Sequence, residues 1–151
     1  DFIGPSYKPS LEKFYNEVSI LDPDSEFIHY IGKVDYKLLP QYYENSDMAL
    51  FASSCENMPN ILLEMMASGL PIACSNRGPM PEIYGEEGCY FNPEDPKEIS
   101  ETILNLILDV ELRKKISDYV LHRVESYQWD NTTKQTMGFL KQFSKNHLEE
   151  V

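Results

Sequence analysis

The order of elements in this chain follows from the stretch Ser53-Ser-Cys-Glu-Asn-Met-Pro-Asn-Ile-Leu-Leu-Glu-Met-Met-Ala-Ser-Gly-Leu-Pro-Ile-Ala-Cys-Ser75. The apolar run Asp47–Ser53 leads into it and predicts a strand that is buried on both faces. Pro59 stands where the first residue of a helix is expected, and Gly69 stands where that helix must end. A second apolar run, Leu70–Cys74, follows directly. The stretch therefore predicts a strand, a loop, a helix, a turn and a strand.

Two acidic residues mark this unit. Glu56 lies in the loop at the carboxyl end of the first strand, and Glu64 lies within a helix that is apolar almost all round. Such a helix is expected to be buried, where a carboxylate is costly unless it is paired. A sugar or ribose diol would pair with it, and the nearby helix N-terminus suits a phosphate. The alternative is that Glu56 is a solvated loop acid and Glu64 a rim residue beside a lysine or arginine.

Outward from this unit, apolar residues recur at the spacings of strands and helices in alternation. The further strands are expected at Phe2–Gly4, which should be buried, at Phe27–Ile31 and at Cys89–Phe91. Helices are expected at Ser10–Val18 with Ser10 as N-cap, at Asp35–Asn45 with a restart at Pro40, and around Glu82–Tyr84. Asp95–Glu98 forms a capping box that opens another helix.

The apolar faces of the carboxyl-terminal helices are also readable from spacing. The first carries Ile99, Ile103, Leu106 and Ile107, the second Leu112, Ile116, Tyr119, Val120 and Val124, and the last, from near Asp130, Met137, Leu140 and Phe143. The whole pattern predicts an α/β fold, a Rossmann-like and mostly parallel sheet with helices on both faces and helices at the carboxyl terminus. Ligands of such folds bind beyond the carboxyl ends of the strands, where Glu56 falls. Glu64 joins it if its side chain points back toward the start of its helix.

Composition limits the classes of function. With 151 residues, 42% hydrophobic and 25% charged, the chain fits one globular domain. Its formal net charge of −12 argues against a nucleic-acid-binding surface and against a polybasic membrane-binding patch. Neither a signal peptide nor an apolar run near the ~18 residues of a membrane span is visible. The three cysteines lack metal-ligand spacing and are expected to be reduced thiols of a cytosolic protein.

The spacing Glu56-x7-Glu64 resembles the Glu-x7-Glu motif of the retaining glycosyltransferases of family four, which have the two-domain GT-B fold. The resemblance extends over nearly the whole chain. It includes Phe2–Pro5, Ile31–Val34, Leu39–Tyr42, Pro59–Leu63, Ala67–Ile72, Gly78–Ile83 and Gly88–Pro93. It implies that residues 1–151 are a partial carboxyl-terminal nucleotide-sugar-binding domain, which is one half of a GT-B fold. The amino-terminal acceptor domain and the first β-α unit of this domain would be absent, and the start at Asp1, inside an apparent strand, is interpreted as that of a fragment.

The resemblance also implies roles for single residues. Glu64 would hold the ribose hydroxyls, and Glu56 is the catalytic candidate because it would contact the transferred sugar. The donor-binding positions would be Asn57, Met58, Pro59, Asn60 and Ile61 through backbone N–H groups, Lys33 and Val34 near the base, and Arg77 at a phosphate. Alternatively, Lys33 and Arg77 are solvated surface cations. No metal ion and no cofactor are implied.

Two features depart from the family pattern. Met65 stands where most members have alanine, which changes packing more than chemistry. The family's Gly-Arg…Lys segment, which clamps the diphosphate, belongs to the β-α unit that precedes this stretch. We therefore expect no useful transferase activity and at best weak nucleotide affinity from this piece alone. The sheet would be rearranged, filled by another chain, or completed by residues outside this sequence.

The resulting prediction is the donor-binding domain of a hexosyltransferase. It would transfer a hexose or N-acetylhexosamine from a nucleotide sugar, with a UDP-sugar favoured, to a glycan or polyprenyl-linked acceptor held by the absent domain. The acidic, Asn- and Tyr-rich composition suggests a bacterial O-antigen or capsule enzyme in the cytoplasm, peripheral at the inner membrane face. The alternatives are a non-catalytic doubly wound nucleotide-binding or signalling module and a GT-B-fold epimerase or phosphorylase. The sequence identifies neither the sugar nor the base nor the acceptor.

Overall fold

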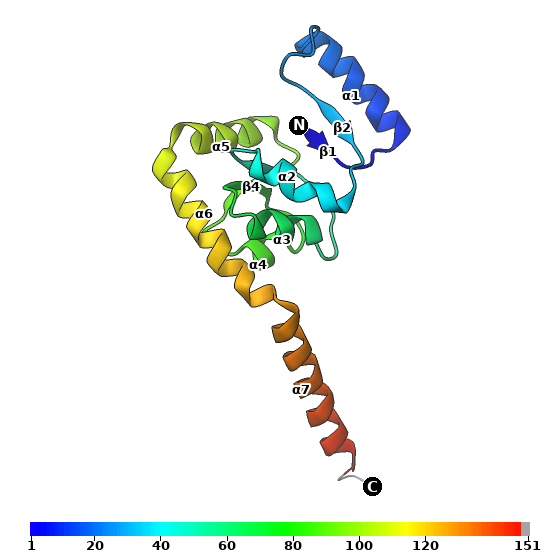
Figure 1. The fold of residues 1–151 in the computed structure, drawn as a ribbon, viewed down its shortest axis with the longest axis vertical. Coiled ribbons are helices and arrows are strands. Elements are labelled where there is room, and N and C mark those ends of the chain that lie inside the picture. The colour runs from blue at the N-terminus through cyan, green and yellow to red at the C-terminus, as the bar shows by residue number, and fades with distance from the viewer. Residues whose placement is uncertain (149–151) are drawn as a thin grey trace. The chain divides into compact units, whose positions relative to one another are not determined.

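The computed structural model describes residues 1–148, with side chains to residue 144, and divides into two compact units (Figure 1). The first unit comprises Asp1–Tyr42 and the second begins at Tyr43. Each unit contains its own parallel sheet, so the strands pair as β1-β2 and as β3-β4-β5. The predicted α/β class with parallel strands and flanking helices is confirmed. The strands form two sheets, however, where the sequence predicted one.

The first unit is built around a short parallel pair. It contains β1 (Phe2–Ile3), α1 (Lys8–Leu21), β2 (Tyr30–Gly32) and the 3-10 turn η1 (Tyr36–Leu38), after which α2 (Leu39–Glu44) begins. The Phe14 ring on α1 packs edge-to-face on the Phe2 ring, with 4.9 Å between centroids. Even so, Phe2 is 50% exposed and Ile3 39% exposed, so the prediction that this strand is buried is wrong.

Two boundaries in this unit differ from those predicted. The α1 helix begins at Lys8 after Tyr7, so Ser10 lies inside it and is not the N-cap. The β2 strand begins only at Tyr30, because the Asp22 carboxylate accepts the N–H groups of Glu26, Phe27 and Ile28. Those N–H groups are therefore unavailable to the strand. Burial raises the pKa of Asp22, but these three hydrogen bonds outweigh it and the net shift is downward.

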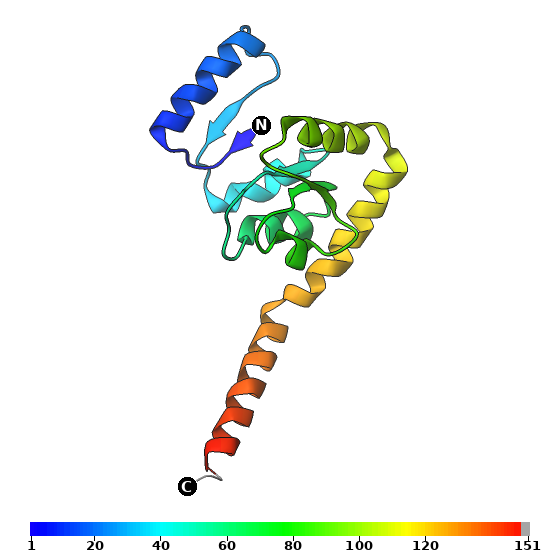
Figure 2. The same cartoon turned by 180° about the vertical axis from the view of Figure 1, so that it is seen from behind.

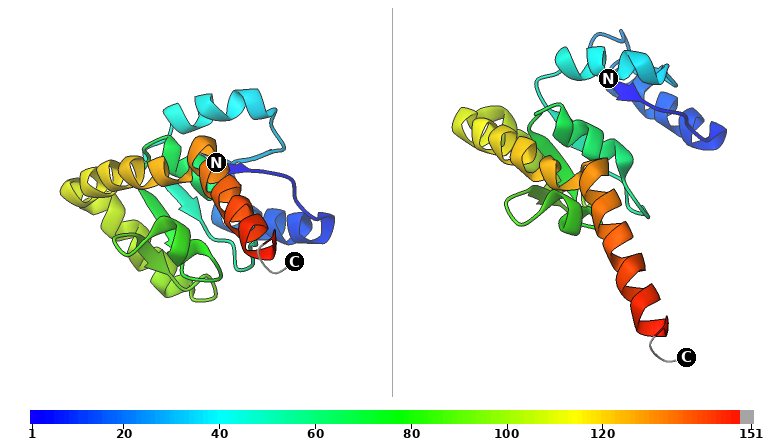
Figure 3. Two further views of the ribbon diagram at one scale, coloured as in Figure 1. Left: turned by 90° about the horizontal axis from the view of Figure 1, so that it is seen from below. Right: turned by 60° about the horizontal axis from the view of Figure 1, so that its bottom comes forward.

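The second unit contains the sheet that carries the stretch quoted first. Its strands are β3 (Ala49–Phe51), β4 (Ile72–Ser75) and β5 (Cys89–Phe91), all parallel, with Phe51 opposite Cys74 and Ser75 opposite Phe91. Its helical elements after α2 are α3 (Asn60–Ala67), α4 (Met80–Tyr84), α5 (Pro96–Leu108), α6 (Val110–Val124), η2 (Glu125–Tyr127) and α7 (Trp129–Leu148). Figure 2 shows this sheet and its helices from the opposite side, and Figure 3 shows α7 as one continuous helix.

The core of the second unit lies where α3, α4, α5 and α6 meet the sheet. Its fully buried residues include Leu62, Met66, Ile72, Tyr84, Phe91, Leu106, Ile116 and Val120. The Tyr84 hydroxyl donates to the Ile72 carbonyl at 2.6 Å, which satisfies a polar group inside the core. The predicted faces of α5 and α6 thus provide core residues, except for Ile107, which is half exposed. Met137, Leu140 and Phe143 of α7 are also about half exposed.

Some of the predicted burial and helix ends in this unit are confirmed and others are wrong. Ala49 and Phe51 are buried, but Leu50 is 40% exposed, so β3 is covered on one face and not on both. Pro59 precedes α3 as its N-cap and is not its first residue. Gly69 follows the helix with a φ of +75°, as predicted. Asp95 caps α5 as predicted, but its own N–H donates to the Asn92 carbonyl, so the reciprocal bond of a capping box is absent.

Candidate functional site

The candidate site is the edge of the second sheet where three parallel strands end. The loop Ala52–Pro59 follows β3, the loop Asn76–Pro79 follows β4, and Asn92–Asp95 follows β5. Since the strands are parallel and adjacent, their carboxyl ends bring these loops to one edge, where ligands of such sheets bind. Within this unit lie Glu56, Glu64 and Arg77, together with the predicted donor-binding stretch between the two glutamates.

The Glu56 loop and the Arg77 loop lie against each other. Gly78 has a φ of +53°, and a Cβ built on it would lie 3.7 Å from the backbone oxygen of Glu56. Glycine adopts this left-handed backbone without a steric penalty. Glu56 itself is half-buried. The structure thus places the catalytic candidate beside the loop that carries the predicted phosphate contact.

The start of α3 meets the same edge, but not every predicted donor there is available. Pro59 has no N–H, and the Asn60 N–H donates to the Met58 carbonyl at 2.9 Å. The prediction that Pro59 and Asn60 bind the donor through their backbone N–H groups is therefore wrong. The predicted N–H donors that remain are those of Asn57, Met58 and Ile61. Of these, Met58 and Ile61 have side chains that are about half exposed. The positive end of the helix dipole still favours an anion at this position.

Glu64 lies on the half-exposed side of α3. Leu62 and Met66 on the same helix are fully buried, whereas Ile61 is 54% exposed, so the helix is less buried than its sequence predicted. The Tyr43 hydroxyl of α2 donates to Glu64 Oε2 at 3.5 Å. This tyrosine was not predicted as a partner of Glu64, for which only a ligand diol or a nearby cation was expected.

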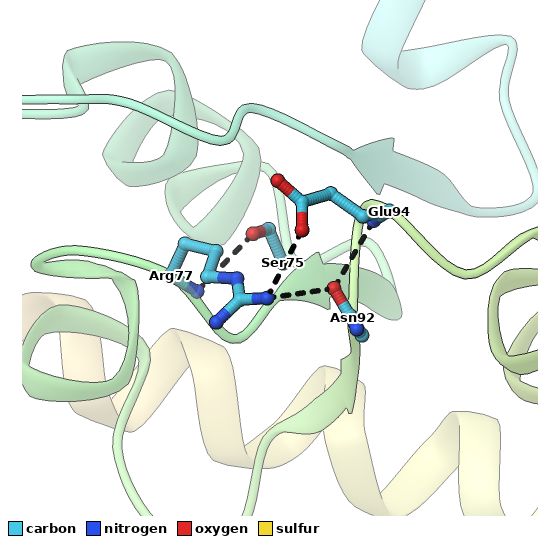
Figure 4. Close-up of polar contacts among 4 residues, drawn as sticks. All are labelled: Ser75, Arg77, Asn92 and Glu94. Carbon is cyan, nitrogen blue, oxygen red and sulfur yellow. Dashed lines mark hydrogen bonds and ion pairs between the residues drawn. The ribbon is translucent and has the colours of Figure 1, made fainter.

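Arg77 is bound by the last residue of β4 and by the loop after β5 (Figure 4). Its N–H donates to Ser75 Oγ, and its Nη2 donates to Asn92 Oδ1 at 3.1 Å and to Glu94 Oε2 at 3.4 Å. Asn92 and Glu94 were not predicted as site residues. The available signal was their position directly after a predicted strand, at the carboxyl edge of the sheet.

Lys33 and Val34 belong to the first unit, where they follow β2 directly. Lys33 is exposed and Val34 is half-buried. The preceding Gly32 has a φ of +77°, and its carbonyl accepts the Gly4 N–H at 2.8 Å. These contacts fix the loop at the carboxyl ends of β1 and β2 in the sheet of the first unit, whereas the prediction placed both residues at the edge of a single sheet that also carried Glu56.

Two of the three cysteines are held in the protonated form by burial. Burial raises the pKa of the Cys74 thiol to about 12, which keeps the thiol protonated. Burial also raises the pKa of the Cys89 thiol. Between residues 1 and 144, the structure contains no group of three or more His, Cys, Asp or Glu side chains that could hold a metal ion. In the same range no helix combines the length and apolar character needed to cross a membrane.

The comparisons with known proteins identify the family of this chain. Residues 2–109 match the family model described as "Glycosyl transferases group 1". This chain belongs to that family. The group 1 match includes all three strand-end loops described above and ends just after α5.

Two relatives of known name extend the comparison. The chain is 31% identical over 115 residues to the O-antigen chain mannosyltransferase B of Escherichia coli, covering 76% of this chain and 30% of the relative. It is 29% identical over 138 residues to the sulfoquinovosyl transferase SQD2 of Arabidopsis thaliana, covering 87% of this chain and 26% of that protein. The chain thus spans less than a third of the length of either relative.

Solved structures share the fold of this chain. The carboxyl-terminal domain of LpcC from Francisella tularensis, a glycosyl transferase group 1 family protein, superposes with a TM-score of 0.67 at 26% identity. That match covers 80% of this chain and 64% of the solved one. HepE from Anabaena, solved with UDP and glucose, superposes with a TM-score of 0.79 at 18% identity, covering 93% of this chain and 39% of HepE. At that identity the likeness establishes the fold alone.

Proposed function

We propose that this chain is the donor-binding domain of a retaining hexosyltransferase. The observation that carries the proposal is the meeting of the Glu56 loop, the start of α3 and the Arg77 loop at one edge of a parallel sheet. Family membership supports the reaction class, and the complex of HepE with UDP and glucose supports a UDP-sugar as donor. The sugar would be a hexose or N-acetylhexosamine, and the acceptor a glycan or lipid-linked glycan.

Each part of the edge has a chemical role in the proposal. The two carboxylate oxygens of Glu64 accept hydrogen bonds from the ribose diol, and the Tyr43 hydroxyl orients one of them. The N–H groups and dipole at the start of α3, with the Arg77 guanidinium, face the diphosphate. Glu56 contacts the transferred sugar from the adjoining loop.

In the transfer step, the bond between the anomeric carbon and the β-phosphate oxygen breaks, and the diphosphate leaves with the electron pair. The acceptor oxygen bonds to the same face of the anomeric carbon and passes its proton to an oxygen of the departing diphosphate. Stabilising the charge that develops on the diphosphate is the main task of the start of α3 and Arg77. Orienting the acceptor hydroxyl would fall to residues outside this chain. No metal ion is needed in this scheme.

We further propose that the reaction belongs to the synthesis of a bacterial surface polysaccharide, such as O-antigen or capsule. It would take place in the cytoplasm, at the inner face of the membrane, where a polyprenyl-linked acceptor is accessible. The name of the Escherichia coli relative supports this assignment. Any contact with the membrane would be made by residues beyond this chain.

The test is calorimetry of UDP, GDP and ADP, with and without Mg²⁺, on this chain and on the full-length protein. Metal-independent binding of one nucleotide that Glu64→Ala removes is expected. Glu101→Ala is the matched control, since that carboxylate is exposed on α5 and pairs only with Lys97 in the described part of the chain. If the folded full-length protein binds none of the three nucleotides, the proposal is wrong.

A further inference from the structure

Arg77 is held at the carboxyl ends of β4 and β5 by side chains from the opposite loop (Figure 4). One N–H of its Nη2 donates to Asn92 Oδ1 at 3.1 Å, and Nη2 also donates to Glu94 Oε2 at 3.4 Å. Asn92 Oδ1 in turn accepts the backbone N–H of Glu94 at 3.1 Å. A single amide oxygen therefore fixes both the guanidinium and the loop that carries its second partner.

The backbone beneath Arg77 is fixed as well. Its N–H donates to Oγ of the fully buried Ser75 at 3.2 Å. The neighbouring Asn76 N–H donates to the Phe91 carbonyl at 2.9 Å, which continues the pairing of β4 with β5 by one residue. An arginine that is free in a loop loses much rotamer entropy when it binds a ligand, and one already held in place loses less.

The guanidinium keeps donors for a further partner. Nε and Nη1 have no hydrogen-bond acceptor among the residues that the structure describes, and the side chain is 45% exposed. The adjoining Gly78 lies against the Glu56 backbone, so Arg77 stands next to the loop of the catalytic candidate. In a chain of net charge −12, binding a diphosphate calls for a local cation, and the arginine fork matches phosphate oxygens well.

We propose that Asn92 and Glu94 are positioning residues that hold Arg77 for contact with the donor diphosphate. This inference rests on the proposed function and deepens it, because it adds two residues that act through a third. Asn92 contributes more than Glu94, since its hydrogen bond is shorter and Glu94 is largely exposed. Glu94 also carries a charge of the same sign as the diphosphate, which reduces its net benefit.

The experiment is calorimetry on the full-length protein, with the nucleoside diphosphate that the wild type binds and with the matching nucleoside. Arg77→Ala is expected to weaken diphosphate binding about tenfold and to leave nucleoside binding unchanged. Asn92→Ala should weaken diphosphate binding about fivefold. In the Arg77→Ala background it should have no further effect. Glu94→Gln, which keeps an acceptor oxygen, should change affinity less than Asn92→Ala.

Asn105→Ala is the matched control, because Asn105 is exposed on α5. It should change neither affinity. Equal loss of nucleoside and diphosphate affinity in Asn92→Ala, or full additivity with Arg77→Ala, would show a merely structural role and overturn the inference. Unchanged diphosphate binding in Arg77→Ala would overturn it while leaving the proposed function intact. If the wild type binds no nucleoside diphosphate, both proposals fail together.

Discussion

The Tyr43 hydroxyl donates a hydrogen bond to Glu64 Oε2 at 3.5 Å, from α2 to α3. This contact restrains one oxygen of the carboxylate proposed to bind the ribose. Tyr43→Phe removes the donor and keeps the ring, so we expect nucleotide affinity to fall two- to fivefold, about 0.5–1 kcal/mol. Calorimetry checks this against Tyr36→Phe, a matched change at an exposed tyrosine. Equal affinities in Tyr43→Phe and wild type would show that this hydroxyl does not orient Glu64.

Substitutions of Glu64 and Glu56 should affect nucleotide binding and turnover differently. In the full-length protein, Glu64→Gln is expected to weaken nucleotide binding, since an amide offers one acceptor oxygen where a carboxylate offers two. Glu56→Ala should lower kcat more than it lowers nucleotide affinity, because its proposed contact is with the transferred sugar. Steady-state kinetics and calorimetry on both variants separate the two effects. The opposite pattern would mean that the two roles are exchanged.

Helix ends that depend on neighbouring residues were predictable from the sequence. Gly69 ends α3 and Asp95 caps α5 because a left-handed glycine and an N-cap carboxylate act within a few residues. Boundaries and burial that depend on distant partners were not predictable. The β2 strand is shortened by Asp22, and Phe2 stays half exposed although its sequence is apolar.

The same distinction holds for the candidate site. The position of Glu56 follows from strand order alone, and the structure places it at the expected edge. The partners of Arg77 lie 15 and 17 residues away and meet it only through the pairing of β4 with β5. The link from Tyr43 to Glu64 likewise joins residues that are 21 positions apart in the chain. Spacing in a sequence does not contain such contacts.

Alkaline pH should destabilise the second unit. Burial raises the pKa of the Cys74 thiol to about 12, above the ~8.5 of an unfolded cysteine. Below pH ~8.5 both states bind the proton, and above it the unfolded state releases it first, so stability falls as pH rises toward 12. From pH 8 to 9.5 we expect a loss of about 1 kcal/mol in the free energy of unfolding from this group. Burial also raises the pKa of Tyr84 and Tyr90, which adds to the loss at higher pH.

Urea denaturation at the two pH values measures this loss. Cys74→Ala should be less stable than wild type at pH 8, because it leaves a cavity, but its stability should depend less on pH. Cys55→Ala is the matched control, since that cysteine is exposed. A steep pH dependence that persists in Cys74→Ala would assign the effect to other groups.

Two glycines in helical regions should respond oppositely to alanine. Gly85 follows α4 with a φ of +89°, and a Cβ there would overlap the Tyr119 hydroxyl and lie 3.3 Å from Arg123 Nε. Arg123 Nε donates a hydrogen bond to the Ile83 carbonyl, so its guanidinium has little freedom to move away from an added Cβ. Gly85→Ala should therefore cost about 2 kcal/mol or more in the free energy of unfolding.

Gly138 lies within α7 with nothing within 4 Å of a built Cβ, so Gly138→Ala should stabilise that helix by up to ~1 kcal/mol. Urea denaturation checks the first value, and amide hydrogen exchange along α7 checks the second. A Gly85→Ala variant as stable as wild type would contradict the packing of α6 against the end of α4.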